Sequence, residues 1–348
     1  MGIHCEINLC KHLDGAFTPG STVSGCIKYA IDEDTVFNRI TVSLKGNGRL
    51  SMKRKQSKNR TQTYWNKEEY VDIYNVIHND ENGENKLPVG SYESQFSFTL
   101  PEKIPSTLYY SKYVASYDIT CKISYYIRIK FKRPGFLSFD KKFKKEITVV
   151  SGITPRYPNI PSICGERKSL TQLFSKKNSV VDIKATIKTR IIKPGDKIKL
   201  TYEVNNDTNI VIKDIETKLM EVYTFTSENG RDVTADKDVK DTDSKTGSIK
   251  AGGTKSMDIE IIPPSDKVSL DYSKMVTREY IVSIIARLPL PHRNAVLKIP
   301  VQIGEEDVIR LHGDAPPSYW ETMVEDTKID GKDDVDFKKP DKDMGEKS

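Results

Sequence analysis

The segment with the clearest potential for specific chemistry is Pro316-Pro317-Ser318-Tyr319. Two consecutive prolines fix φ at about −65° and favour the polyproline II helix, an extended conformation with a solvated backbone. Because such a segment is already ordered, it loses little conformational entropy when it docks in an aromatic groove. The spacing of Pro316, Pro317 and Tyr319 therefore predicts a ligand for a WW domain, with the tyrosine ring in a pocket beside the proline groove.

A group of cations in the first half of the chain is the second candidate site. Six basic residues share one short stretch of sequence: Arg49, Lys53, Arg54, Lys55, Lys58 and Arg60. Such a cluster can contact phosphorylated peptides or anionic lipid headgroups through charge-assisted hydrogen bonds. A solvated hairpin loop is the alternative interpretation, and both interpretations also apply to the four lysines that surround Phe143.

Catalytic and metal-binding patterns find no support in the sequence. The five histidines are scattered, without metal-ligand spacing, and no phosphate-cradling glycine loop occurs. Asp236, Asp238, Asp241 and Asp243 lack the central glycine and the spacing of an EF-hand loop. The five cysteines form no CxxC pair and fit neither a disulfide framework nor a zinc site. We expect no catalytic centre, no metal and no cofactor.

Length and composition limit the class of protein. A chain of 348 residues has room for two domains with separate cores. It contains no apolar run long enough to span a membrane, and its first residues do not resemble a signal peptide. The net charge of +6 is unevenly distributed, with +7 in residues 1–150 and −7 in residues 305–348. The lack of a signal peptide and of a disulfide framework leads us to expect a cytoplasmic protein. Because no nucleic-acid-binding motif accompanies the basic half, we also expect that it does not bind nucleic acid.

Alternation of apolar and polar residues dominates both halves and predicts an all-β fold. The longest alternating run extends from Ile119 to Phe131, and similar runs follow Ile198 and Tyr280. Turn-forming pairs such as Pro134-Gly135 separate these runs, as in β-sandwiches. Helical periodicity is scarce, and only Ser106–Tyr113 and the segment after Pro317 are compatible with a short helix.

An internal repeat divides the chain. Displacing the sequence by 175 positions aligns Pro19-Gly20 with Pro194-Gly195, and Ile40 and Leu44 with Ile215 and Leu219. The repeat predicts two tandem immunoglobulin-like β-sandwiches rather than one large barrel. We place them at residues 1–150 and 179–304, joined by a proline-bearing linker at residues 151–178. The acidic residues 305–348 have few large apolar side chains and are expected to form a disordered tail.

Three segments together resemble the arrestin family. Residues 17–25, with the turn at Pro19-Gly20, resemble the opening of an arrestin N-terminal domain. Residues 181–206 and the strand Leu297–Gly304 resemble the opening hairpin and the closing strand of the C-terminal domain. The single Pro-Pro-x-Tyr motif at residues 316–319 is typical of α-arrestins, the arrestin-domain-containing proteins.

The resemblance implies a function. It suggests a non-enzymatic trafficking adaptor that recruits a WW-domain HECT ubiquitin ligase to a membrane receptor or transporter and promotes its ubiquitination, endocytosis and endosomal sorting. Such an adaptor is recruited peripherally to the plasma membrane and endosomes. On the lipid interpretation of the basic cluster from Arg49 to Arg60, an anionic membrane surface is a further partner. The alternative is a phosphate-sensing or retromer-like sorting scaffold in which the PPSY segment is incidental. An enzyme with its site on the sandwich loops is a third class.

Overall fold

The computed structural model describes residues 2–10, 15–56, 60–80, 86–135, 140–170 and 179–306, and every regular element in this part of the chain is a β-strand. Residues Met1–Asp307 form one compact unit. No helix in the described residues is long and apolar enough to cross a membrane. The prediction of an all-β fold is confirmed.

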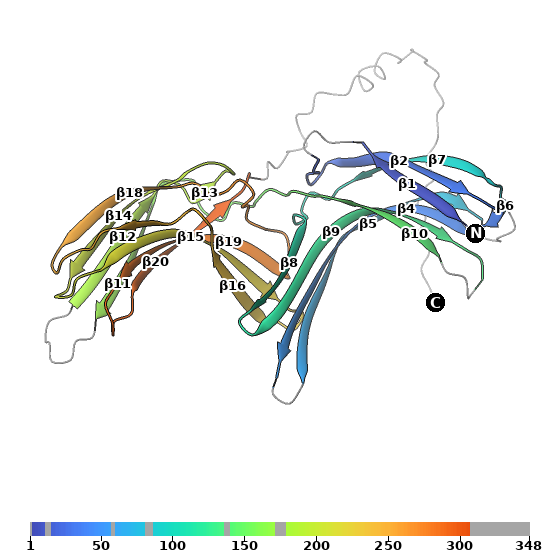
Figure 1. Ribbon diagram of the computed structural model, residues 1–348. Helices are drawn as coiled ribbons and strands as arrows, with labels where there is room; N and C mark the ends of the chain where they lie inside the picture. Colours follow the sequence, from blue (N-terminus) through green and yellow to red (C-terminus); the bar gives the residue numbers. More distant parts are fainter. Residues whose placement is uncertain are drawn as a thin grey trace, which may run out of the picture. The chain divides into compact units, whose positions relative to one another are not determined.

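The first half of the chain folds into a sandwich of two antiparallel sheets (Figure 1). The smaller sheet has the strand order β1 (Ile3–Leu9), β2 (Thr22–Ile31) and β7 (Gly90–Thr99). The larger sheet has the order β10 (Lys141–Ile147), β9 (Tyr117–Lys132), β4 (Arg39–Lys55) and β5 (Thr61–Asn79), with β8 (Leu108–Val114) also paired to β9. A short pair, β3 (Thr35–Val36) and β6 (Lys86–Leu87), lies outside these sheets.

The second half repeats this plan. One sheet has the order β11 (Ser162–Leu170), β12 (Ser179–Ile187), β14 (Ile198–Asp207) and β18 (Thr254–Ile261). The other has the order β13 (Ile191–Ile192), β20 (Ala295–Ile303), β19 (Val276–Arg287), β15 (Asp214–Thr226) and β16 (Asp232–Asp238), with β17 (Ser244–Thr246) paired to β15. No sheet in the described residues joins the two halves, so the prediction of two sandwiches is confirmed.

Strand β9 shows why the alternating sequence forms a sandwich. Its apolar positions from Ile119 to Phe131 are fully buried at every second residue, because successive side chains of a strand point to opposite faces. Cys121 belongs to this buried set, and burial raises the pKa of its thiol to about 12. The polar residues between them face outward and form the surface described below.

The internal repeat is visible in the backbone. Gly20 and Gly195 both have left-handed φ angles, +75° and +86°, which residues with a Cβ rarely adopt. Each turn leads into an inner strand of its sheet: β2 lies between β1 and β7, and β14 lies between β12 and β18. The repeated Pro-Gly therefore marks the same turn in each sandwich.

Two segments differ from the sequence-based expectation. Ser106–Tyr113 is not helical, because Leu108–Val114 forms β8 and pairs with β9. Within the expected linker, residues 151–178, Ser162–Leu170 form β11 and pair with β12. An edge strand leaves most of its side chains in water, and Ile163 is 79% exposed, so the sequence there lacks the alternation that reveals buried strands.

Removal of one buried hydroxyl tests the packing of the first sandwich. The Tyr125 hydroxyl donates to the Pro105 carbonyl at 2.7 Å in the core. We expect Tyr125→Phe to lower the free energy of unfolding by about 1–2 kcal/mol, because the carbonyl loses its partner away from water. Urea denaturation measures this change.

A matched control is Tyr92→Phe. The Tyr92 hydroxyl donates to the Pro88 carbonyl at the same 2.7 Å but at an exposed position, where water replaces it. We expect a loss below about 0.5 kcal/mol. Equal losses in the two variants would contradict the buried environment of Tyr125.

Candidate functional site

The larger sheet of the first sandwich packs at one end against the second sandwich. Phe131, near the end of β9, contacts Tyr29 of β2, with ring centroids 5.2 Å apart, so this end lies over the smaller sheet. On β8, Tyr110 instead contacts Phe225 of β15 at a centroid distance of 4.7 Å. Phe225, Val233 and Met275 of the second sandwich belong to the same buried cluster as the core of the first.

Polar contacts accompany this shared core. Glu68 of β5 accepts hydrogen bonds from the Ser273 hydroxyl at 3.0 Å and from the Lys274 backbone N–H at 2.7 Å. The Glu228 backbone N–H donates to the Trp65 carbonyl at 2.9 Å. Strand β5 therefore provides both side-chain and backbone partners for loops of the second sandwich.

Gly48 of β4 allows the close approach of Met275. A Cβ added at Gly48 would lie 2.2 Å from the Met275 Cε and 2.7 Å from the Tyr70 hydroxyl. Even an alanine at this position requires both side chains to move, so the lack of a side chain at Gly48 allows the two sandwiches to pack closely here.

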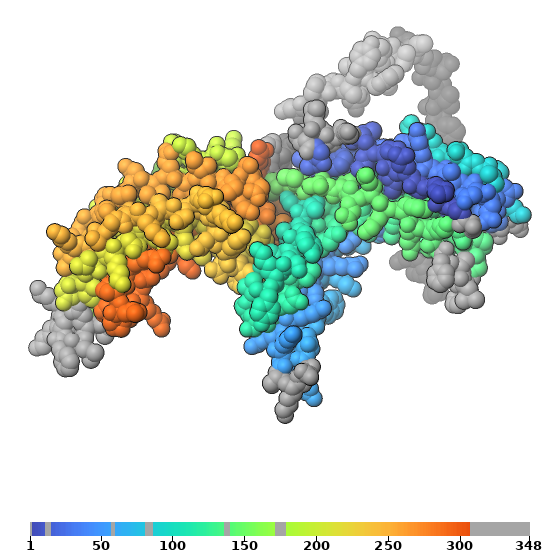
Figure 2. Space-filling model, viewed as in Figure 1, coloured from blue at the N-terminus to red at the C-terminus, as the bar shows by residue number. Residues whose placement is uncertain are grey.

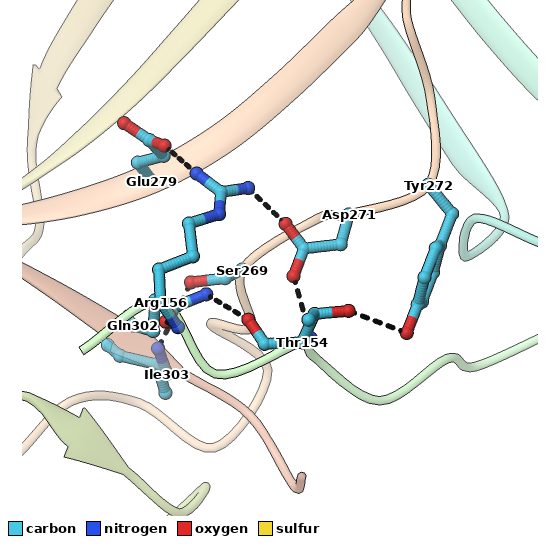
Figure 3. Close-up of polar contacts among 8 residues, drawn as sticks. All are labelled: Thr154, Arg156, Ser269, Asp271, Tyr272, Glu279, Gln302 and Ile303. Carbon is cyan, nitrogen blue, oxygen red and sulfur yellow. Dashed lines mark hydrogen bonds and ion pairs between the residues drawn. The ribbon is translucent and has the colours of Figure 1, made fainter. Parts of the chain in front are cut away.

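A polar network ties the segment after the first sandwich to the second (Figure 3). The guanidinium of Arg156 forms ion pairs with Asp271, which precedes β19, and with Glu279 on β19. Its backbone N–H donates to the Gln302 side-chain carbonyl at 2.7 Å, and the Gln302 amide donates to the Thr154 carbonyl at 3.0 Å. This network therefore joins the segment that follows the first sandwich to β19 and β20 of the second.

The electrostatics of the network depend on burial. The Asp271 side chain is 6% exposed, whereas that of Arg156 is 40% exposed. Burial alone lowers the pKa of Arg156, but Asp271 and Glu279 outweigh it and raise that pKa above its usual value. The arginine therefore stays charged and compensates a buried carboxylate. No periodic pattern marks Arg156 in the sequence, since it lies between prolines.

The predicted basic residues do not form one patch. Arg49 is exposed on the outer face of β4, whereas Arg54 stacks on the Tyr117 ring with its Cζ 5.6 Å from the centroid. Burial raises the pKa of Tyr117, but hydrogen bonds and charge from Arg231 and Arg54 lower it overall. Lys53, Lys55 and Arg60 lie towards the end of the β4–β5 hairpin, and Lys58 is outside the described residues. The cluster is split between two faces of one hairpin.

The structure instead groups Arg49 with cations distant in sequence. Arg49 lies directly opposite Lys67 of β5 and Lys122 of β9. Further along the same face, Lys144 of β10 lies opposite Arg128 of β9. A hollow of about 450 Å³ extends from Arg49 and Lys122 to Lys142 and Lys144. The outward parity of the alternating strands was the sequence signal that could have identified Lys67 and Lys122.

The WW-ligand residues Pro316, Pro317 and Tyr319 lie outside the described residues, as does the acidic segment from residue 307 onward. The described chain ends at Glu305 and Glu306, where the Ile153 backbone N–H donates to the Glu305 carbonyl at 2.8 Å. Within the described ranges, His, Cys, Asp and Glu side chains form no group of three suited to a metal ion.

Two sandwiches joined through a shared core and a polar network define the arrestin class of fold. A family model for the arrestin (or S-antigen) N-terminal domain matches residues 5–155, and one for the arrestin (or S-antigen) C-terminal domain matches residues 177–308. The chain belongs to the arrestin family, and it is of the α-arrestin type.

A curated relative supports this assignment. Arrestin domain-containing protein 17 of Caenorhabditis elegans is 25% identical to the chain over 203 residues. The match covers 55% of this chain and 45% of the relative, so the chain spans less than half of that protein's length.

The Arg156 network provides a test of the polar interface. Arg156→Gln removes both ion pairs and leaves Asp271 buried without its cation. We expect the free energy of unfolding to fall by about 1–2 kcal/mol, below the cost for a fully buried pair because Arg156 is partly exposed. Thermal and urea unfolding measure the loss.

Arg167→Gln is the matched control. The Arg167 Nε lies 3.6 Å from the Asp182 carboxylate, with the arginine side chain 74% exposed. An exposed pair contributes little, so we expect a change within about 0.5 kcal/mol. Equal changes in the free energy of unfolding of the two variants would show that the Arg156 network stabilises the protein no more than an exposed ion pair does.

Proposed function

We propose that this chain is a non-enzymatic trafficking adaptor. Its two sandwiches contact a membrane receptor or transporter, and Pro316-Pro317-Ser318-Tyr319 recruits a WW-domain HECT ubiquitin ligase. The observation that carries the proposal is the order of parts: two arrestin domains in one compact unit, followed in the sequence by a Pro-Pro-x-Tyr motif.

The proposed mechanism is proximity. A ligase held by the motif acts on a cargo held by the sandwiches, because tethering raises the effective concentration of the ligase at that cargo. A single short polyproline motif binds with modest affinity, on the order of micromolar, which corresponds to about −8 kcal/mol. Modest affinity suits an adaptor that exchanges ligases and cargo. Ubiquitination, endocytosis and endosomal sorting of the cargo follow from this arrangement.

The domains support binding through the rigidity of their interface. The shared core at Tyr110 and Phe225 and the hydrogen bonds of Glu68 with Ser273 and Lys274 join residues of the two sandwiches. A preorganised surface loses less entropy on binding than one that orders when the partner arrives. This supports cargo contact across both sandwiches rather than through a single loop.

Tyr319→Ala tests the recruitment step. The substitution removes the ring that fills the pocket beside the proline groove, so we expect loss of WW-domain capture and of cargo ubiquitination. Pro317→Ala should weaken capture by about 1–2 kcal/mol, because it loosens the preorganised segment. Pull-down of the full chain with isolated WW domains measures capture, and thermal unfolding should stay unchanged in both variants.

Ser318→Ala is the matched control in the same motif. It changes the variable position between proline and tyrosine and should retain capture. Full ligase recruitment by the Tyr319→Ala protein would show that the motif is not the contact. The sandwiches alone, as a phosphate-sensing or retromer-like sorting scaffold, would then account for the function.

A further inference from the structure

The outer face of the first sandwich's larger sheet carries cations in an unusual row. Across three adjacent strands, Lys67 of β5, Arg49 of β4 and Lys122 of β9 lie directly opposite one another. Like charges in directly opposed positions destabilise a sheet. Lys122 has a partial partner in Glu146, at 3.2 Å, whereas Arg49 forms no ion pair or hydrogen bond with the described residues. Binding of an anion from outside the protein would offset the repulsion among these cations.

Exposed aromatic rings flank this row on the same face. Tyr109 of β8 lies opposite Lys122, and Trp65 of β5 lies opposite Ser51, one outward position beyond Arg49. Tyr109 is 72% exposed, Tyr113 is 71% exposed and Trp65 is 50% exposed. The Lys67 Nζ lies 5.6 Å from the centroid of the Trp65 ring. We call these six residues the basic–aromatic face: Arg49, Trp65, Lys67, Tyr109, Tyr113 and Lys122.

The opposite face of the same strands is covered by the core of the protein, so the outer face is the one that a partner can reach. Leu50 and Met52 of β4 and Tyr110 of β8 point inward and are buried in the cluster that includes Phe225 and Met275. The outer face has no such cover among the described residues. Figure 2 shows the teal atoms of β8 at the surface, beside the blue atoms of the β4–β5 hairpin. A hollow of about 480 Å³ lies between Arg49, Trp65 and Lys67.

We propose that the basic–aromatic face docks on an anionic lipid bilayer. Lys and Arg near such a surface are attracted to its phosphate and carboxylate groups, while Trp and Tyr concentrate at the headgroup level of membranes. A phosphorylated peptide satisfies the cations but leaves three large rings exposed to water, whereas a lipid interface engages both. The ligase motif plays no part in this inference, which holds or fails independently of the proposed adaptor function.

Cosedimentation of the full chain with vesicles tests the proposal. We expect binding to phosphatidylcholine vesicles that contain phosphatidylserine and weak binding to phosphatidylcholine alone. The combined variant Arg49→Glu, Lys67→Glu and Lys122→Glu should lower binding to the anionic vesicles roughly 100-fold, at about 1 kcal/mol for each cation. Binding of the unsubstituted protein should also fall with salt, as the screening length drops from about 10 Å at 0.1 M to about 3 Å at 1 M.

A second variant controls for net charge. Lys184→Glu, Lys237→Glu and Lys298→Glu change three exposed lysines of the second sandwich and reduce the net charge by the same amount. We expect this variant to bind almost as well as the original protein. An equal loss in both triple variants, or equal binding to neutral and anionic vesicles, would overturn the proposal.

Fluorescence supplies a readout that needs no charge reversal. The chain has two tryptophans, Trp65 and Trp320, so Trp320→Phe leaves Trp65 as the single probe. Phosphatidylserine vesicles should shift the Trp65 emission to shorter wavelength. An unchanged spectrum, together with a shift caused by a phosphorylated peptide, would assign the face to peptide binding and refute membrane docking.

Discussion

The packing of the larger sheet of the first sandwich is the constraint on which the rest of the structure depends. The three-stranded sheet covers only one end of its long strands. That end packs on Tyr29, whereas the other end presents Tyr110, Leu50 and Met52, which need another cover. Burying a large apolar side chain is favourable by about 1.5–3 kcal/mol. The second sandwich provides that cover through Phe225 and Met275, while most of its apolar residues form a buried cluster of their own.

The polar contacts follow from this shared core. Once the apolar faces meet, backbone and charged groups at the margin lose water and need protein partners. Glu68 binds Ser273 and Lys274, and Arg156 compensates the buried Asp271. These partners are distant in sequence: Glu68 contacts the second sandwich from the first, and Arg156 contacts it from the segment that follows the first sandwich. The apolar core supplies stability, and the polar margin makes the contact specific.

The same arrangement decides which surface is available for function. Covering the inner face of β4, β5, β8 and β9 leaves their outer face as the exposed one, and strand alternation places the cations and rings there. In the adaptor that we propose, the sandwiches and the PPSY segment carry separate tasks. Docking of the basic–aromatic face on lipid would hold the adaptor at the bilayer where its cargo resides.

The sequence alone determined the local features, because strands and turns depend on neighbouring residues. Alternation predicted β9, the repeated Pro-Gly predicted equivalent turns at Gly20 and Gly195, and the motif order predicted the family. Only the tertiary structure showed that β8 is a strand, because its pairing with β9 overrides a helix-compatible sequence. Likewise, the register of β4 decided that Arg49 joins Lys67 and Lys122 while Arg54 turns towards Tyr117. Pairing between distant strands sets such neighbours, and no short stretch of sequence encodes them.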